Sequence, residues 1–431
     1  MCTMASRTSK AGVATAVLFF AVQLAVAGST NQVAGSTDER IQELEHRIDA
    51  LSNELERRSW GGGLVPEVIE GEYGMGAAAS KVYQSAQGVS LGGYGEALYQ
   101  NFEDDKTDEL DFVRAVLYVG YKFNDEWVFN MELELEHAST DKEGSSSAEF
   151  AYLDYLYDPK LNFRAGLVLI PMGLVNELHE PNAFLSARRP AVESQLIPTT
   201  WRENGIGIFG ELGPVSYKGY LVNGLRGEDF TAGGIRGGRQ KGSKAIVEDF
   251  AWVGRLDWAV TSGLSLGGSA YYGDSGQDLE IDLDTQIYDV HVDWTWRGLD
   301  LKALAVIVNL DNVEKLNRVI GSEGGTVADA DIESVGSEMI GWYVQLGYDL
   351  FATLDRDEQS FTPFIRFEHI DTQRSTPSGF KEDGKFDVEL VTVGMNYKPI
   401  DEIVFKAEYQ FADDNADGGT DQLNLALGYV F

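Results

Sequence analysis

The last nine residues of the chain, Leu423–Phe431, alternate between large apolar and small or polar side chains. Apolar residues stand at positions 423, 425, 427, 429 and 431. Such strict alternation predicts a β-strand with one apolar face. That face can lie against lipid or pack on a protein core, so the rest of the chain has to decide between the two.

The N-terminus has the three parts of a secretory signal peptide. Two basic residues precede an apolar run over residues 11–25, which ends in the small-residue site Ala25–Ala27. A membrane anchor helix is the alternative, but the run is shorter than the roughly 18 residues that a spanning helix needs. We expect residues 1–27 to be removed. Cleavage would also remove Cys2, the only cysteine.

Beyond residue 27 the sequence has no apolar run long enough for a spanning helix. A chain of this kind can cross a bilayer only as a closed β-barrel, because lipid cannot satisfy the backbone groups of an open sheet edge. Its 48 glycines, 48 aromatic residues and only 10 prolines fit strands and turns. The formal charge of −35 disfavours nucleic acid as a partner.

Residues 36–58 follow a helical period, with apolar residues at steps of three and four. This pattern predicts a short coiled-coil helix within a periplasmic region of residues 28–59. A single amphipathic helix lying on another surface is the alternative. Residues 60–88 are rich in glycine and lack periodicity, which indicates a linker.

From residue 89 to residue 431 the period changes to two, which predicts an all-β domain, a transmembrane antiparallel β-barrel of about 16 strands. An even number is what a single-chain bacterial barrel requires. The expected strands are 89–101, 109–123, 127–137, 148–158, 162–173, 204–212, 215–224, 249–260, 264–274, 285–296, 300–310, 338–350, 361–370, 386–398, 403–412 and 422–431.

The connections between these strands alternate between short and long. Short periplasmic turns and long outer loops produce this rhythm, and residues 351–360 are its one exception. Eight aromatic residues fall at strand ends on the short-turn side, where they would form an interfacial girdle. They are Tyr121, Phe123, Trp127, Trp258, Trp296, Tyr348, Tyr397 and Phe431.

The chain from residue 89 onward resembles the Gram-negative outer-membrane porins related to the phosphate-selective porin family. The residues that carry the resemblance lie in Leu91–Ala97, Glu132–His137, Glu177–Pro181, Pro198–Glu203 and Gly238–Lys241. The resemblance implies a barrel in the cell outer membrane and passive transport. It also implies that Leu427, Tyr429 and Phe431 form the assembly signal read by the barrel-assembly machinery. Phosphate-selective members line the pore with basic side chains, whereas this chain is acidic, so no binding residue is carried over.

Strand alternation indicates which charged side chains face the lumen. If Leu133 and Leu135 face lipid, the three glutamates between and beside them face inward. Charge on the inner wall indicates an aqueous channel, although opposite charges could simply pair across strands. The candidates for the lumenal wall are Arg114, Lys122, Glu132, Glu134, Glu136, Arg164, Arg255 and Asp257.

Two long loops are candidates for narrowing or guarding the pore. The connection 174–203 is long and apolar for a solvent loop, so it could fold inward or pack on a neighbour. Its constriction candidates are Glu180, Arg188, Arg189, Glu193, Arg202 and Glu203. The next long loop carries a candidate basic cluster for the pore mouth, Arg236, Arg239, Lys241 and Lys244.

The sequence predicts a porin for small hydrophilic solutes or ions, without cofactor or metal. His291 with Asp289 and Asp293 allows an acid–base pair, but no nucleophile motif accompanies it. The alternative function is a closed barrel acting as a tether through the coiled coil. Expected partners are outer-membrane lipid and lipopolysaccharide, the assembly machinery and further copies of the chain in a homotrimer.

Overall fold

The computed structural model describes Arg47 and residues 71–103, 106–141, 144–322, 334–354, 359–416 and 418–431. Residues 1–61 and 62–431 form two separate units. The predicted signal peptide and the predicted coiled-coil helix belong to the first unit and, apart from Arg47, lie outside the described residues. The described strands and the three helices α3 to α5 belong to the second unit.

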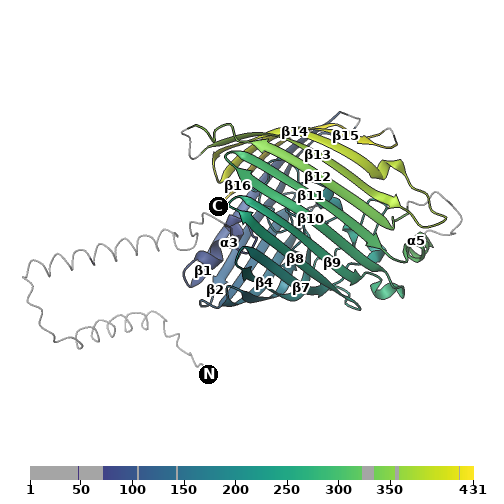
Figure 1. Cartoon of the computed structure of the whole chain (residues 1–431), viewed down its shortest axis with the longest axis horizontal. Coiled ribbons are helices and arrows are strands. Elements are labelled where there is room, and N and C mark those ends of the chain that lie inside the picture. Colours follow the sequence, from purple (N-terminus) through teal and green to yellow (C-terminus); the bar gives the residue numbers. More distant parts are fainter. Residues whose placement is uncertain are drawn as a thin grey trace, which may run out of the picture. The chain divides into compact units, whose positions relative to one another are not determined.

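Sixteen antiparallel strands form a closed barrel in which each strand pairs with its neighbours in sequence and β1 pairs with β16 (Figure 1). The prediction of a sixteen-stranded barrel is therefore confirmed. The strands are β1 (Gly88–Phe102), β2 (Glu109–Lys122), β3 (Trp127–Glu136), β4 (Ser145–Asp158), β5 (Leu161–Leu169), β6 (Arg202–Leu212), β7 (Val215–Asn223), β8 (Phe250–Thr261), β9 (Leu264–Asp274), β10 (Asp284–Trp296), β11 (Leu299–Leu310), β12 (Glu338–Tyr348), β13 (Ser360–Ser375), β14 (Asp387–Ile400), β15 (Ile403–Asp414) and β16 (Gln422–Val430).

The last residue of the chain takes part in the closure of the barrel. The backbone N–H of Phe431 donates to the carbonyl of Gly93 at 2.9 Å, and the N–H of Gly93 donates to the carbonyl of Phe431 at 3.0 Å. A β-carbon at Gly93 would lie 2.7 Å from the ring of Phe431 and still closer to the backbone carbonyl of Val116, so only glycine fits there. We call the barrel end where β1 begins and β16 ends the turn end, and the opposite end the loop end.

Replacing the terminal aromatic residue should impair assembly. We expect Phe431→Ser to lower the amount of folded barrel in the outer membrane, because the change removes an outward-facing ring from the strand that closes the sheet. The matched control is Phe411→Ser, which removes an equally exposed ring from β15. Quantifying the heat-modifiable folded band in outer-membrane fractions measures the effect. Equal amounts for both variants would show that Phe431 carries no assembly signal.

The two faces of the barrel differ as the alternation predicts. Large apolar side chains such as Trp252 and Val290 are exposed on the outside. Of the eight residues of the predicted girdle, all but the half-buried Tyr397 are exposed. The inner face carries buried charged residues, among them Glu132 and Arg164. This segregation is what a barrel with lipid outside and polar groups inside requires.

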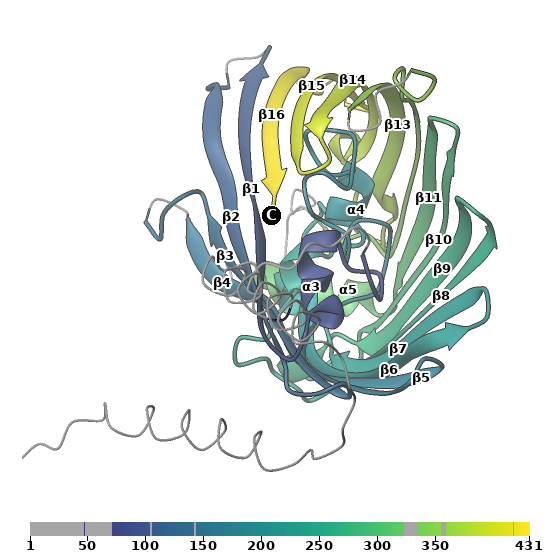
Figure 2. The ribbon, with the colours of Figure 1, turned by 90° about the vertical axis from the view of Figure 1, so that its left-hand side faces the viewer.

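The helices are α3 (Ala77–Gln84), α4 (Ala191–Gln195) and α5 (Val313–Ser322). Among the described residues, no helix has the length and apolar character needed to cross a bilayer. Looking into the barrel, Figure 2 shows α3 and α4 within the ring of strands.

Helix α3 corrects the prediction of a featureless linker over residues 60–88. Its residues Ala78, Ala79, Val82 and Tyr83 are buried and lie on one helical face. The face packs on β1, β2 and β3. Two turns of helix are too short to show a period in a glycine-rich sequence, and the helix is stabilised by packing rather than by its own propensity.

Candidate pore constriction

The connection between β5 and β6, residues 170–201, lies inside the barrel and crosses to the far wall (Figure 2). The carbonyl of Ser186 accepts a hydrogen bond from the ammonium of Lys406 at 2.9 Å. The N–H of Ala187 donates to the carboxylate of Glu408 at 2.8 Å. Because Lys406 and Glu408 belong to β15, these bonds hold the middle of the loop against the wall opposite its origin.

Apolar side chains explain why this loop stays inside. Val192, Leu196, Ile197 and Trp201 are completely removed from solvent and belong to the main apolar cluster of the barrel interior. Burying a side chain of this kind is worth about 1.5–3 kcal/mol relative to leaving it exposed. The apolar character of the loop thus indicates correctly that it does not extend into solvent.

Helix α3 is joined both to the wall and to this loop. The side-chain amide of Asn130 on β3 donates to the carbonyl of Ala79 at 2.8 Å, and the hydroxyl of Tyr83 donates to Asp154 on β4 at 2.7 Å. From the loop, the carboxylate of Glu180 accepts the N–H of Ala79 at 3.0 Å, near the N-terminus of the helix, where a negative charge is favourable. Burial raises the pKa of Glu180.

The inner wall beside α3 is acidic. Glu132 and Glu134 on β3 point inward and are buried, and Glu136 is half-buried, so the predicted inward orientation of this strand's glutamates is confirmed. Arg114 on β2 lies between Glu134 and a further buried acid, Glu96 on β1, with its Nε 3.4 Å from Glu96 and 3.8 Å from Glu134. One guanidinium therefore offsets only part of the negative charge.

A β-bulge adds a further carboxylate to the acidic wall. Glu132 pairs with Phe150 and Leu133 pairs with Ala148, which leaves Glu149 as an extra residue on β4. A bulge interrupts alternation, so Glu149 and its neighbour Phe150 are both buried on the inside.

Arg202 at the start of β6 pairs with this extra glutamate. Its Nη1 donates to Oε1 of Glu149 at 3.0 Å, and its Nη2 donates to the hydroxyl of Ser147 at 2.8 Å. Arg202 was predicted to lie at the constriction, and the structure places it in the interior as a buried partner of the acidic wall.

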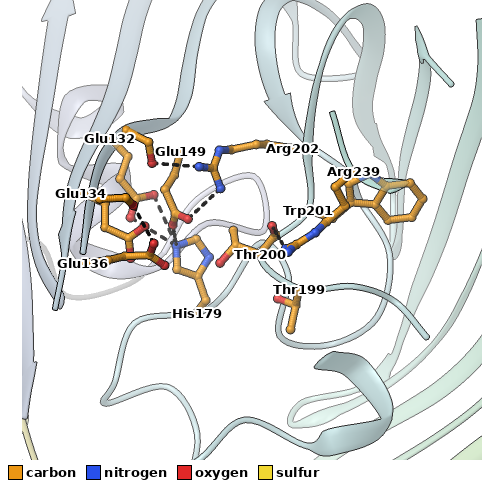
Figure 3. Close-up of polar contacts among 12 residues, drawn as sticks. Glu132, Glu134, Glu136, Glu149, His179, Thr199, Thr200, Trp201, Arg202 and Arg239 are labelled. Carbon is orange, nitrogen blue, oxygen red and sulfur yellow. Dashed lines mark hydrogen bonds and ion pairs between the residues drawn. The ribbon is translucent and has the colours of Figure 1, made fainter. Parts of the chain in front are cut away.

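His179 of the loop faces the same wall (Figure 3). Its Nδ1 is 2.9 Å from the carbonyl of Asn176, while its Nε2 lies 3.3 Å from Glu132 and 3.5 Å from Glu149. Burial, assisted by the charge of Arg189, lowers the pKa of His179 to about 4. Glu149 and His179 were not among the site residues predicted from the sequence. The sequence did indicate an irregularity at Glu149, because strict alternation along the strand would place this carboxylate on the lipid-facing side.

Two predicted constriction residues have a structural role instead. Glu193 and Glu203 are completely buried, so they do not line an open passage. Each carboxylate accepts three hydrogen bonds, which fix the two ends of the loop. The donors are Tyr343, Leu174 and Val175 to Glu193, and Trp201, Asn223 and Gln240 to Glu203.

The remaining constriction candidates are the arginine pair 188–189. Arg188 is exposed to solvent, although its backbone neighbours Ser186 and Ala187 are bound to the far wall. Arg189 is half-buried, and its Nη1 donates to the hydroxyl of Thr200 at 2.7 Å. These two side chains are the cations that the loop itself presents in the interior.

The predicted pore-mouth cluster separates into two parts. Arg236 donates to the carbonyls of Ser194 and Thr199, and Arg239 donates to the carbonyl of Thr200 at 2.8 Å. These two arginines therefore brace the inward-folded loop and do not stand free at the mouth, which corrects the prediction for them. Burial lowers the pKa of Arg239 to about 9, which leaves it charged at neutral pH. Lys241 and Lys244 are exposed, as predicted.

The other predicted wall residues face inward and are paired. Lys122 donates to the carbonyl of Tyr83 in α3 at 3.1 Å. Arg164 forms a buried ion pair with Asp154 at 2.8 Å. Arg255 forms an ion pair with Asp257 at 2.6 Å. The alternative that opposite wall charges pair with one another thus holds for the two arginines.

His291 has acidic partners on both ring nitrogens. Nδ1 lies 2.7 Å from Asp289 and Nε2 lies 2.8 Å from Asp257, whereas Asp293 pairs with Lys302 at 2.6 Å. Of the two flanking aspartates that the sequence offers to His291, Asp289 is therefore the one in contact with the ring. The geometry is that of a hydrogen-bonded wall network.

Comparison with known proteins gives one related sequence and several related folds. No established family profile matches the chain. A protein of Aquifex aeolicus (strain VF5), described only as uncharacterized, is 35% identical over 376 residues, which cover 85% of this chain and 86% of that protein.

The related folds are those of outer-membrane porins. OmpF of Salmonella typhi, solved in complex with daunomycin, is 13% identical and superposes with a TM-score of 0.54 over 80% of this chain and 97% of its own. An anion-selective porin from Comamonas acidovorans is 10% identical, with a TM-score of 0.51 over 80% of this chain and 99% of its own. At such identities the comparison shows the fold, which is the porin barrel.

Proposed function

Because the chain belongs to one protein family with the Aquifex aeolicus protein and folds as a porin barrel, we propose that it is a passive channel for small hydrophilic solutes or ions. The observation that carries this proposal is the segregation of the barrel into an apolar outer face and a charged inner wall. Sixteen strands enclose enough space for an aqueous passage.

Two cavities at the turn end, each with charged side chains in its lining, support this proposal. One cavity, of about 360 Å³, lies between residues 71–74 ahead of α3, the loop and the wall. Its lining includes Lys218, Arg255 and Asp257. The other, of about 330 Å³, is lined in part by Asp300 and Lys398. Charged linings of both signs favour water and small polar solutes over an apolar ligand.

The same proposal includes a constriction with separated charges. The acids of β3 and β4 occupy one wall, and Arg188 and Arg189 of the loop supply cations within the interior. A permeating ion would pass close to both groups. Such local charges determine selectivity more than the net charge does, because distant surface charges are screened within about 10 Å.

The location, orientation and assembly of the barrel are also part of the proposal. We place the barrel in the outer membrane of a Gram-negative bacterium, with the turn end in the periplasm and with lipid and lipopolysaccharide around it. A homotrimer, recognition by the assembly machinery and kinship with the phosphate-selective porins remain predictions. No catalytic role, cofactor or specific solute is assigned.

The direct test of the channel proposal is ion conduction by the purified protein in a planar lipid bilayer. Discrete current steps are expected, because the charged interior should hold water and ions. A folded barrel that passes no ions would favour the alternative function, a closed tether.

A further inference from the structure

Three side chains from three separate segments converge on one point of the interior (Figure 3). Glu132 comes from β3, Glu149 from the bulge of β4, and His179 from the inward-folded loop. One ligand atom of each lies within 4.8 Å of the other two. All three residues are buried, with at most 2% of their surface exposed.

The tautomer of His179 follows from its contact with the backbone. Nδ1 is 2.9 Å from the carbonyl oxygen of Asn176. A carbonyl can only accept, so Nδ1 carries a proton. In the neutral ring Nε2 then carries a lone pair, which faces the carboxylates of Glu132 and Glu149. Metal-binding histidines are held in this way, with the other ring nitrogen donating to a carbonyl or carboxylate.

Neighbouring side chains orient the two carboxylates. Oε1 of Glu132 accepts from the hydroxyl of Tyr94 at 3.4 Å, and Oε1 of Glu149 accepts from Arg202 at 3.0 Å. Oε2 of each glutamate is buried and has no hydrogen-bond partner. These same two atoms lie 3.3 and 3.5 Å from Nε2 of His179. Oε1 of Glu132 also lies 3.3 Å from Nε2, so both oxygens of Glu132 and Oε2 of Glu149 are close to the histidine nitrogen.

We propose that Glu132, Glu149 and His179 form a binding site for a divalent transition-metal ion of the Zn²⁺ type. Ligand atoms placed about 2.0–2.2 Å from a tetrahedral Zn²⁺ are roughly 3.3–3.6 Å apart. The distances from Nε2 to the two Oε2 atoms, 3.3 and 3.5 Å, match that spacing. A fourth position stays open for water.

The ligand chemistry selects among cations. An imidazole nitrogen suits Zn²⁺ and its neighbours, whereas Ca²⁺ and Mg²⁺ prefer all-oxygen sites. A 2+ ion would offset the charge of two carboxylates whose mutual repulsion is relieved only in part by the ion pair of Arg202 with Glu149. Because the ligands come from two strands and the loop, a bound ion would fasten the loop to the acidic wall.

The test is equilibrium dialysis of the full mature chain, refolded with Zn²⁺, with the bound metal measured by mass spectrometry. We expect wild type to retain one Zn²⁺ more than His179→Gln, which should bind at least roughly tenfold more weakly at that site. Co²⁺ in place of Zn²⁺ should give visible absorption in wild type but not in His179→Gln. An excess of Mg²⁺ should not displace the ion.

The matched control is His291→Gln. That histidine also contacts two carboxylates, but one on each ring nitrogen, so no single lone pair faces both. The control should bind Zn²⁺ as wild type does. If His179→Gln fails to give a heat-modifiable folded barrel, Glu149→Gln takes its place. Equal Zn²⁺ binding by wild type and the folded ligand variant would overturn the site and leave a shared proton as the bridge.

Discussion

Removing helix α3 by deleting residues 72–86 should raise the single-channel conductance roughly twofold or more, since a helix with its side chains is about 10 Å across. The helix occupies the interior near the turn end and is joined to the wall through Asn130 and Asp154. Its removal should widen the passage without altering the sixteen strands. Conductance in a planar bilayer, measured at one salt concentration for both proteins, gives the ratio.

A single substitution tests whether the current depends on how firmly α3 is held in place. Glu180→Gln removes the charge at the N-terminus of the helix and weakens the bond to Ala79, so we expect more frequent current fluctuations at nearly unchanged mean conductance. Heat-modifiable mobility shows whether each variant is folded. Equal conductance of wild type and a folded deletion variant would place α3 outside the conducting path.

Replacing Arg188 and Arg189 together with glutamine should shift the permeability ratio toward cations by severalfold. A charge a few ångströms from a permeating ion interacts with it by about 1–4 kcal/mol, depending on how far water screens the pair. These two arginines are the interior cations of the loop, whereas Arg202 is already paired with Glu149. Reversal potentials across a salt gradient measure the ratio.

Two further variants test whether charge at this place causes the shift. Arg188→Lys with Arg189→Lys keeps the charge and should keep the selectivity of wild type. Lys241→Gln with Lys244→Gln removes two exposed charges from another loop, and its smaller effect should vanish at high salt. If the glutamine variant at 188 and 189 has the reversal potential of wild type, the pair does not face the ion path.

Strand periodicity predicted most of the fold, because lipid outside and charge inside impose opposite chemistry on alternate residues. The number of strands and the inward orientation of Arg114, Glu132 and Arg164 all followed from that rule. The rule fails where alternation breaks. The bulge at Glu149 inverts one position of β4, so a site residue was missed.

Contacts between distant segments could not be predicted in the same way. Helix α3 depends on packing against strands, and two turns of helix leave little trace in a sequence. Arg236 and Arg239 have the composition of a solvent-exposed basic cluster, and only the folded loop supplies the carbonyls that they bind. Glu193 and Glu203 are completely buried and have structural roles. Their charge alone, read from the sequence, could not predict that burial.

The most direct test of the central claim is a single-channel recording of wild-type protein in a planar bilayer. We expect discrete, stable current steps, smaller than those of the variant without α3, because the loop and the helix narrow an open, water-filled barrel. A folded wild-type barrel that shows no current steps across several lipids and salt concentrations would show that the protein is not an open channel.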